Sequence, residues 1–387
     1  MNMLENEITL PEWKLMENGI SSEQLSIVAD FIQSGEKLTY GKNIEKFEKS
    51  WSKWQGCKYS VFVNSGSSAN LLAVNAIQPY HKKSLWVSQA CTWSTTVSPI
   101  ILRGDSLQLC DVNLENFGPD LENLELIFKT QSPQYLFLVH LLGFNCYSTQ
   151  LQELCDRYNV EILEDCCEAH GASYNNKKVG NFGKISTFSF YYGHHMTTIE
   201  GGMVCTNDES LYERLLLLRS HGLMRELPPT MQEKYKDLEV DENFTFLLPG
   251  FNVRSTEINA VLGLEQIKDL DTRIKIRNDN FNLFCDLIDK SKYECPFDIE
   301  GISSFCFPII RKDGNINHTK KILLDNNIHV RPIIAGNLYN HPFIANVNMK
   351  RYDKTCSYIH NCGLYVGNNH MVNSVMVERL CGLLGEI

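Results

Sequence analysis

The 387-residue sequence lacks three features that would each indicate a particular class of protein. It has no basic block, and 36 Lys and Arg against 46 Asp and Glu give a net charge of −10, which argues against bulk nucleic-acid binding. The longest apolar runs, 135–142 and 215–218, are far too short to span a bilayer. The first residues, 1–11, are polar and acidic, so they do not predict a signal peptide. We therefore expect a cytoplasmic protein without a membrane partner.

Cysteine is plentiful, but its usual metal-binding spacings are missing. Fourteen cysteines are scattered along the chain, many within apolar segments, and neither CxxC nor CxC occurs. Reduced core cysteines in a cytosolic protein are the expected state. No zinc or iron–sulfur ligation is expected from these spacings, and no metal site is predicted.

Apolar strand-like runs alternate with amphipathic helical stretches through the first two thirds of the chain. The predicted strands are 59–63, 84–87, 106–110, 135–140, 160–163, 185–190 and 203–206, and the predicted helices between them include 67–77, 120–128 and 149–158. This alternation predicts an α/β fold with a mostly parallel sheet covered by helices. Ligands of such sheets sit at the carboxyl ends of the strands.

The pattern changes in the last third. A long helical stretch is predicted over 255–278, and short strands at 306–310 and 330–334 flank a helix near 319–326. We therefore predict a large domain over 1–265, whose first thirty or so residues pack on the other domain, and a smaller α+β domain over 266–387. The charged, Pro-containing stretch 224–241 is weakly periodic and predicts a surface loop.

Three segments at predicted strand ends or helix starts carry polar or aromatic groups suited to a ligand. Gly66 and Ser67 open a helix and could cradle a phosphate, although Ser-Gly-Ser is also a common capping turn. Glu164-Asp165 ends an apolar strand, where a carboxylate could pair with a protonated ring nitrogen or merely cap the next helix, and Glu168 could face the same cavity. Trp93 could stack on a flat cofactor or lie in the core.

A fourth segment, 250–257, precedes the long helix and contains Asn252 and Arg254. Such groups at a helix start can bind anions, or they can serve only as capping and surface groups.

Taken together, these motifs resemble the DegT/DnrJ/EryC1/StrS family of sugar aminotransferases and dehydratases, which use pyridoxal 5'-phosphate (PLP). The resemblance covers nearly the whole chain, and its motifs occur in the family's order. They are Gly66-Ser67, Trp93, Val139-His140-Leu141, Glu164-Asp165, Phe188-Ser189-Phe190, Gly201-Gly202, Asn252-Val253-Arg254 and Arg331-Pro332. The resemblance implies a fold-type I, aspartate-aminotransferase-like protein that forms a homodimer with shared active sites.

One position departs from the family's aminotransferases. Where their segment carries a lysine that forms a Schiff base with PLP, this chain carries His194, followed by His195. An imidazole cannot form that bond but can move protons near neutral pH. In the family, this exchange marks the deoxygenating branch. The iron–sulfur member of that branch uses clustered cysteines that this chain lacks.

The resemblance also implies roles for individual residues. In the implied arrangement, Asp165 pairs with the pyridine nitrogen, Trp93 stacks on the ring and Glu168 lies near the ring hydroxyl. Gly66, Ser67 and Ser189 would bind the phosphate, and Asn252 of the partner subunit would contact the cofactor. His221 and Arg225 would bind the carboxylate of the amino donor, and Arg331 is a weaker candidate for a substrate contact. His194 would be the catalytic base.

The implied reaction removes the hydroxyl at carbon 3 of a nucleotide-linked 4-keto-6-deoxyhexose, with the GDP-linked mannose derivative favoured. The cofactor acts as pyridoxamine 5'-phosphate, L-glutamate restores that form, and ammonia is released. The chain would then be a lyase of dideoxysugar biosynthesis for a lipopolysaccharide O-antigen. Two alternatives stay open at this point: a nucleotide-sugar 4-aminotransferase, and a non-catalytic member of the family.

Overall fold

The computed structural model describes residues 12–238, 240–241 and 243–386. The segment 1–11, predicted not to be a signal peptide, lies outside the described residues, as do Glu239 and Glu242. No helix in the described part of the chain is both long enough and apolar enough to cross a membrane.

The main sheet has seven strands in the order β1-β9-β8-β5-β4-β2-β3. These are β1 (Tyr59–Val63), β9 (Gly202–Thr206), β8 (Ile185–Ser189), β5 (Glu161–Asp165), β4 (Tyr135–Val139), β2 (Leu85–Gln89) and β3 (Ser106–Cys110). The pairs β2–β3, β2–β4, β4–β5 and β5–β8 are parallel, while β9 runs antiparallel to both β8 and β1. The predicted α/β fold with a mostly parallel sheet is confirmed.

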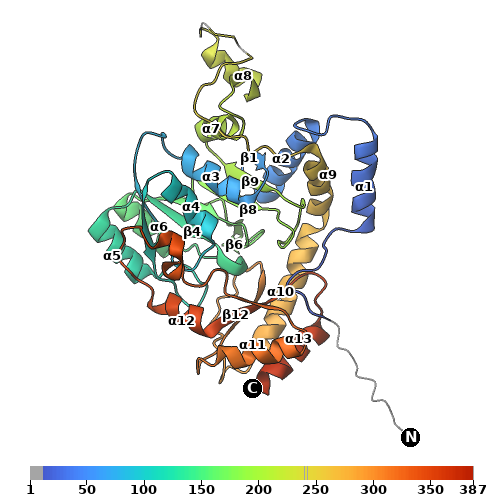
Figure 1. The fold of residues 1–387 in the computed structure, drawn as a ribbon, viewed down its shortest axis with the longest axis vertical. Helices are drawn as coiled ribbons and strands as arrows, with labels where there is room; N and C mark the ends of the chain where they lie inside the picture. The colour runs from blue at the N-terminus through green and yellow to red at the C-terminus, as the bar shows by residue number, and fades with distance from the viewer. Residues whose placement is uncertain (1–11, 239, 242, 387) are drawn as a thin grey trace.

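Helices cover this sheet, as Figure 1 shows. They include α3 (Gly66–Ala76), α4 (Ser94–Leu102), α5 (Leu121–Gln131), α6 (Thr149–Tyr158) and α7 (Glu209–Arg219). Most strand residues are buried on both faces, as expected where helices pack against each side of a parallel sheet. Helices α3 and α4 begin just beyond the carboxyl ends of β1 and β2, so their N-termini lie at the edge of the sheet where ligands bind.

A second sheet, formed by the last third of the chain, has three antiparallel strands in the order β10-β12-β11. Its strands are β10 (Cys306–Ile310), β12 (Gly363–Gly367) and β11 (Val330–Pro332), and the helices of this region are α10 (Leu270–Leu287), α11 (Ile316–Asp325), α12 (Lys354–Cys362) and α13 (Ser374–Gly385). The predicted boundary at residue 265 falls near the end of α9 (Glu257–Gln266). The boundary stays a prediction.

The N-terminal segment joins the second sheet to the rest of the molecule. Trp13 forms a parallel bridge with Ile328, its indole N–H donates to Gly367 O at 3.0 Å, and its ring packs edge-on against Phe307. Farther along the chain, α1 (Ser22–Gln33) packs on α9.

Several sequence-based boundaries are wrong. The stretch predicted as one helix over 255–278 is two helices, α9 and α10, joined by a 3₁₀ turn at Ile267–Asp269. The helical pattern does not stop near Phe281, because this residue is buried inside α10. Residues 224–241 are not only loop but contain short helices, including α8 (Pro229–Gln232), and this region projects from the body beyond α7 (Figure 1).

Truncating Trp13 to alanine should lower the free energy of unfolding by about 3–5 kcal/mol, because it empties a fully packed site and removes a buried hydrogen bond. The denaturation midpoint in urea measures this change. Tyr80→Ala, at a side chain that is 65% exposed, should change stability by no more than about 0.5 kcal/mol. Equal midpoints for wild type and Trp13→Ala would contradict the anchoring role of this residue.

Candidate active site

A buried carboxylate, Asp165, lies at the carboxyl end of β5. Its Oδ2 accepts hydrogen bonds from Asn70 Nδ2 of α3 and Thr96 Oγ1 of α4, each at 2.8 Å. Its Oδ1 accepts from the Cys167 backbone N–H at 3.1 Å. Thr187 of β8 in turn donates to Asn70 Oδ1 at 2.6 Å, which orients that amide. Four separate elements therefore hold this carboxylate in one position.

The N-terminus of α3 lies against the end of β8. A Cβ placed on Gly66 would fall 2.5 Å from Cβ of Ser189 and 3.2 Å from Cys167 Sγ, so only glycine permits this contact. Ser65 caps the helix by accepting from Ser68 N at 3.1 Å, which bears out the capping interpretation for Ser65. The cap leaves the other N–H groups of the first turn available to an anion.

Trp93 is not a core residue, because its side chain is 53% exposed. It occupies the N-cap position of α4, and Ser67 Oγ and Thr95 Oγ1 link the starts of α3 and α4 at 3.0 Å. A cavity of about 590 Å³ opens beside Trp93 and Ser94. Its other walls come from Pro332 and from residues 334–343 and 360 in the last third of the chain.

Glu168 follows β5 by three residues and faces the same region. Its Oε2 accepts from the Leu142 N–H at 2.9 Å. Burial raises the pKa of Glu168 to about 8; the Leu142 N–H opposes this shift and the charge of Asp165 adds to it. The carboxyl of Glu168 is therefore largely protonated at neutral pH and can donate a hydrogen bond.

His194 lies in the turn after β8, half-buried against Phe305, with ring centroids 5.5 Å apart. Burial lowers the pKa of His194 to about 4; a hydrogen bond that its ring donates to the Cys167 backbone opposes this shift, and the charge of Arg277 adds to it. The imidazole is therefore neutral at physiological pH, the form that accepts a proton. Its Nδ1 has no hydrogen-bond partner among the described residues.

His195 points elsewhere. It is buried, and its Nε2 contacts Ser303 O at 3.0 Å and Ser303 Oγ at 3.1 Å. A third histidine, His170, is fully buried near both, with its ring centroid 6.2 Å from that of His194 and 5.3 Å from that of His195. Packing is the evident role of His195.

Glu164 and Asp165 point to opposite faces of β5, as neighbouring strand residues do. Glu164 accepts from His140 Nε2 at 3.0 Å and from the backbone N–H groups of Gly180, Phe182 and Gly183 at 2.6–2.8 Å. His140, Glu164 and Cys166 could geometrically hold a metal ion, but His140 Nε2 already donates to Glu164 and its Nδ1 accepts from Cys146 N. Glu164 is thus a structural group of the sheet.

Asn252, His221 and Arg225 do not join the cluster around Asp165. All three are exposed, and they lie on neighbouring segments because Ser220 bridges to Asn252. Arg225 donates to Asn243 O at 2.9 Å. The segment itself runs beside the start of α3, since Asn64 N donates to Val253 O at 3.0 Å.

Arg254 and Arg331 lie in different parts of the fold, Arg254 just before α9 and Arg331 on the second sheet. Arg254 donates to Asn252 Oδ1 at 3.2 Å and is 3.8 Å from a carboxylate oxygen of Glu226, so it is paired with its surroundings. Arg331 is exposed on β11, and its guanidinium interacts with the hydroxyl of Tyr365, its cross-strand partner on β12.

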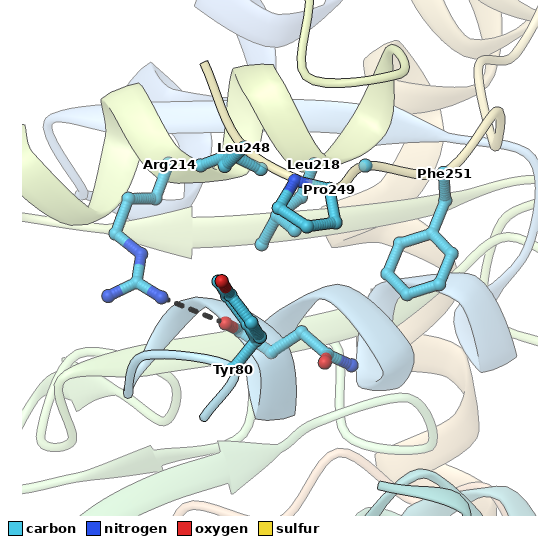
Figure 2. Close-up of a pocket in the computed structure, with 8 residues that line it drawn as sticks. Tyr80, Arg214, Leu218, Leu248, Pro249 and Phe251 are labelled. Atoms are coloured by element: carbon cyan, nitrogen blue, oxygen red, sulfur yellow. Dashed lines mark hydrogen bonds between the residues drawn. The ribbon is translucent and has the colours of Figure 1, made fainter. Parts of the chain in front are cut away.

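A second, smaller pocket of about 160 Å³ is lined in part by Gly250 and Phe251, which directly precede Asn252 (Figure 2). Tyr80 faces Pro249 and Phe251 across it, and Arg214 at its edge donates to Asn75 O at 3.2 Å. None of the predicted site residues lines this pocket.

Sequence reasoning missed several residues that build the site. Asn70, Thr96 and Thr187 position Asp165, and Arg277 contacts the His194 segment. A polar residue in the otherwise apolar stretch 69–74 was the available signal for Asn70.

Comparison with known proteins gives a family and close relatives. The model of the DegT/DnrJ/EryC1/StrS aminotransferase family matches residues 18–366. A GDP-4-keto-6-deoxy-D-mannose 3-dehydratase of Yersinia pseudotuberculosis is 34% identical over 94% of this chain and 95% of its own length. The enzyme of the same name from Escherichia coli O55:H7 is 35% identical over 86% and 89%, respectively.

The fold has a close match among solved structures. A crystal structure of GDP-4-keto-6-deoxymannose-3-dehydratase with a trapped PLP-glutamate geminal diamine superimposes with a TM-score of 0.90. The match covers 96% of this chain and all of that chain, at 30% identity. The predicted aspartate-aminotransferase-like fold is confirmed by this similarity.

Glu164→Gln should lower the free energy of unfolding by about 1–3 kcal/mol at pH 7, because buried donors lose a charged acceptor. Burial alone would raise the pKa of Glu164, but His140 and the backbone N–H groups outweigh it and hold the pKa below its ordinary value. The stabilisation is therefore complete above the unfolded pKa of about 4.3 and is lost as pH falls through the lower folded pKa.

Urea midpoints of wild type and Glu164→Gln measured across pH test this expectation. The gap between them should narrow only below about pH 4. Glu161→Gln, at the exposed start of the same strand, should match wild type throughout. A Glu164→Gln variant as stable as wild type at pH 7 would show that the carboxylate does not stabilise the fold.

Proposed function

Because the chain belongs to the DegT/DnrJ/EryC1/StrS aminotransferase family, we propose that it is a PLP-dependent lyase that removes the carbon-3 hydroxyl of a nucleotide-linked 4-keto-6-deoxyhexose. GDP-4-keto-6-deoxy-D-mannose is the favoured substrate, since two relatives at 34% and 35% identity are named for it. L-Glutamate is the proposed amino donor, and ammonia is the proposed nitrogen product. The observation that carries the proposal is a histidine, His194, where the family's aminotransferases need a lysine.

The residues around Asp165 fit the cofactor. A buried carboxylate held by Asn70 and Thr96 suits a protonated pyridine nitrogen, which would otherwise be costly to bury. The close approach of Gly66 to Ser189 leaves backbone N–H groups of α3 and the Ser189 hydroxyl for the phosphate. Ser67 extends this group, and the exposed Trp93 ring is free to stack on the pyridine.

When bound, PLP supplies an electron sink that stabilises the carbanion formed when a neighbouring C–H bond breaks. The protein's part is to hold this ring and to move protons beside it. Asp165 would keep the pyridine nitrogen of the bound ring protonated. Glu168 is neutral because its pKa is raised to about 8, and it would be able to donate a hydrogen bond to the ring hydroxyl.

His194 is the proposed base. It is neutral at physiological pH, because burial holds its pKa at about 4, and a neutral imidazole has one ring nitrogen that can accept a proton. A lysine here would compete for the cofactor's aldehyde and retain the amino group in an aminotransferase cycle. An imidazole cannot compete for the aldehyde, which favours loss of the hydroxyl and release of ammonia.

The exposed residues Asn252, His221 and Arg225 are proposed to act across a homodimer interface. They cluster on one surface, beside the segment that adjoins α3, and none of them reaches Asp165 in its own chain. The projecting region 224–248 that adjoins them carries exposed Leu238, Val240, Phe244 and Phe246, apolar groups that a second copy would cover. In the dimer, Asn252 of the partner subunit would contact the cofactor, and His221 and Arg225 the carboxylate of glutamate.

The nucleotide sugar would enter beside Trp93. The cavity of about 590 Å³ there is large enough for part of such a substrate, and Arg331 lies next to Pro332 on its wall. Its cationic group is the proposed contact for a negatively charged part of the substrate.

The direct test is an assay of the purified protein with GDP-4-keto-6-deoxymannose, PLP and L-glutamate. Ammonia, 2-oxoglutarate and a sugar product that has lost the carbon-3 hydroxyl should appear together. A 4-aminosugar without ammonia would assign the protein to the aminotransferases. No turnover of any nucleotide sugar would support a non-catalytic family member.

Replacing Asp165 with Asn should weaken cofactor binding by roughly 10- to 100-fold, because a charge-assisted hydrogen bond is worth about 1.5–3 kcal/mol. Cofactor titration followed by absorbance measures the affinity. Asp111→Asn is the matched control, since Asp111 is also buried and accepts backbone N–H groups of Thr355 and Cys356, far along the chain. If Asp165→Asn binds the cofactor as tightly as Asp111→Asn does, Asp165 is not the ring partner.

A further inference from the structure

Arg277 of α10 is a buried cation without a counterion. Its side chain is 1% exposed, and its hydrogen bonds in the described part of the chain go to backbone carbonyls rather than to a carboxylate. Burial lowers its pKa to about 9, the direction expected for a guanidinium removed from water. Burying an unpaired charge costs several kcal/mol, so a fold that needed only packing at this position would do better with an apolar side chain.

The guanidinium donates instead to three backbone carbonyls from different parts of the chain. One Nη group donates to Phe305 O at 3.1 Å and to Asn368 O, and the other donates to His194 O at 3.3 Å. Phe305 immediately precedes β10 and Asn368 immediately follows β12, so both carbonyls belong to the ends of the second sheet. Arg277 thereby joins that sheet to the turn that carries His194.

The surroundings of Arg277 fix its position. Asn368 Nδ2 donates back to Arg277 O at 2.8 Å and to Ser304 Oγ at 3.0 Å. The ring of Phe305 packs on the ring of His194, so the residue that accepts one of the Arg277 hydrogen bonds is also the residue that His194 rests against. A displacement of the guanidinium would move both supports of His194.

We propose that Arg277 is a positioning residue for His194, which clamps the turn of the catalytic base to the second sheet and keeps the imidazole in its proton-accepting form. The proposal rests on the proposed function, in which His194 is the base. Arg277 touches neither cofactor nor substrate in this arrangement, and its effect passes through the His194 backbone and through its charge.

The charge effect follows from the groups that face His194. His170 and Cys167 approach it from the segment after β5, Tyr191 and His195 from its own turn, and Arg277 from α10. Among these groups Arg277 is the only one that is cationic at neutral pH, since burial lowers the pKa of His170 and His195 well below the ordinary value. A fixed positive charge opposes protonation of His194 and adds to the effect of burial.

Three variants distinguish a positioning role of Arg277 from a general contribution to stability. They are Arg277→Met, Arg277→Lys and Arg273→Met. Arg273 is a matched control because it lies one turn earlier on α10, is also buried, and donates to Gln266 and Gly19 rather than to the His194 segment. The measurements are kcat and KM against pH, the midpoint of thermal unfolding, and the ¹⁵N chemical shifts of the His194 ring.

Arg277→Met should lower kcat by roughly 10- to 100-fold with little change in KM, the penalty typical of a misplaced catalytic group. Removing the positive charge of Arg277 should also raise the pKa of His194. Because a base works only when unprotonated, the acid limb of the kcat profile should then move to higher pH. Arg277→Lys keeps the charge but cannot span three carbonyls, so kcat should fall while the acid limb stays in place. Arg273→Met should change stability but neither kcat nor the acid limb.

Two results would overturn the proposal. One is a folded Arg277→Met variant with the kcat and pH profile of wild type. The other is an equal loss of kcat in Arg273→Met, which would make the effect structural. If Arg277→Met does not fold, Arg277→Lys still tests whether Arg277 positions the His194 turn. An unchanged kcat in Arg277→Lys would contradict that role.

Failure of the proposed function would be recognised separately. Wild type that releases no ammonia from any nucleotide sugar refutes the dehydratase reaction but leaves the His194 ring shifts measurable without turnover. Those shifts should report a higher pKa for His194 in Arg277→Met than in wild type. Identical titrations in the two proteins would contradict the link between Arg277 and His194.

Discussion

The arrangement of the site depends on one buried carboxylate, Asp165. Its hydrogen bonds from Asn70 and Thr96 fix the first turns of α3 and α4 against the carboxyl end of β5. Because α3 also presents Gly66 to Ser189, the same contact sets the distance between the proposed ring partner and the proposed phosphate cradle. The donors that reach Asp165 among the described residues are neutral groups, and a buried carboxylate with only neutral partners is the physical reason to expect a cationic ligand group.

The neighbouring residue shows how strand geometry divides two carboxylates between two tasks. Glu164 points to the opposite face of β5, where His140 and backbone N–H groups satisfy it completely. Asp165 keeps fewer protein donors and faces the carboxyl edge of the sheet. A one-residue change of strand register would exchange the two environments, so the fold fixes which carboxylate is structural and which is available to a ligand.

The sequence was sufficient to predict the α/β fold, its strand positions and the residues near the sheet edge, because alternation and family motifs are local signals. It did not predict the break between α9 and α10, since Ile267–Asp269 keeps a helical pattern through a 3₁₀ turn. Asn70, Thr96 and Arg277 were missed for a different reason. Each lies inside a helix, and its importance comes only from a partner that is distant in sequence. Likewise, the exposure of Asn252 on a surface beside α3 depends on tertiary structure and could not be predicted from the sequence.

In the proposed mechanism, His194 moves protons in a site without the usual lysine. The most direct measurement is the rate at which L-glutamate converts PLP bound to the protein into its amine form, followed by cofactor absorbance after rapid mixing, in wild type and in His194→Asn. The variant should bind PLP with unchanged affinity and react at least about 10²-fold more slowly, the contribution typical of a general base. A His194→Asn variant that reacts at the wild-type rate would contradict the claim and assign proton transfer to another group.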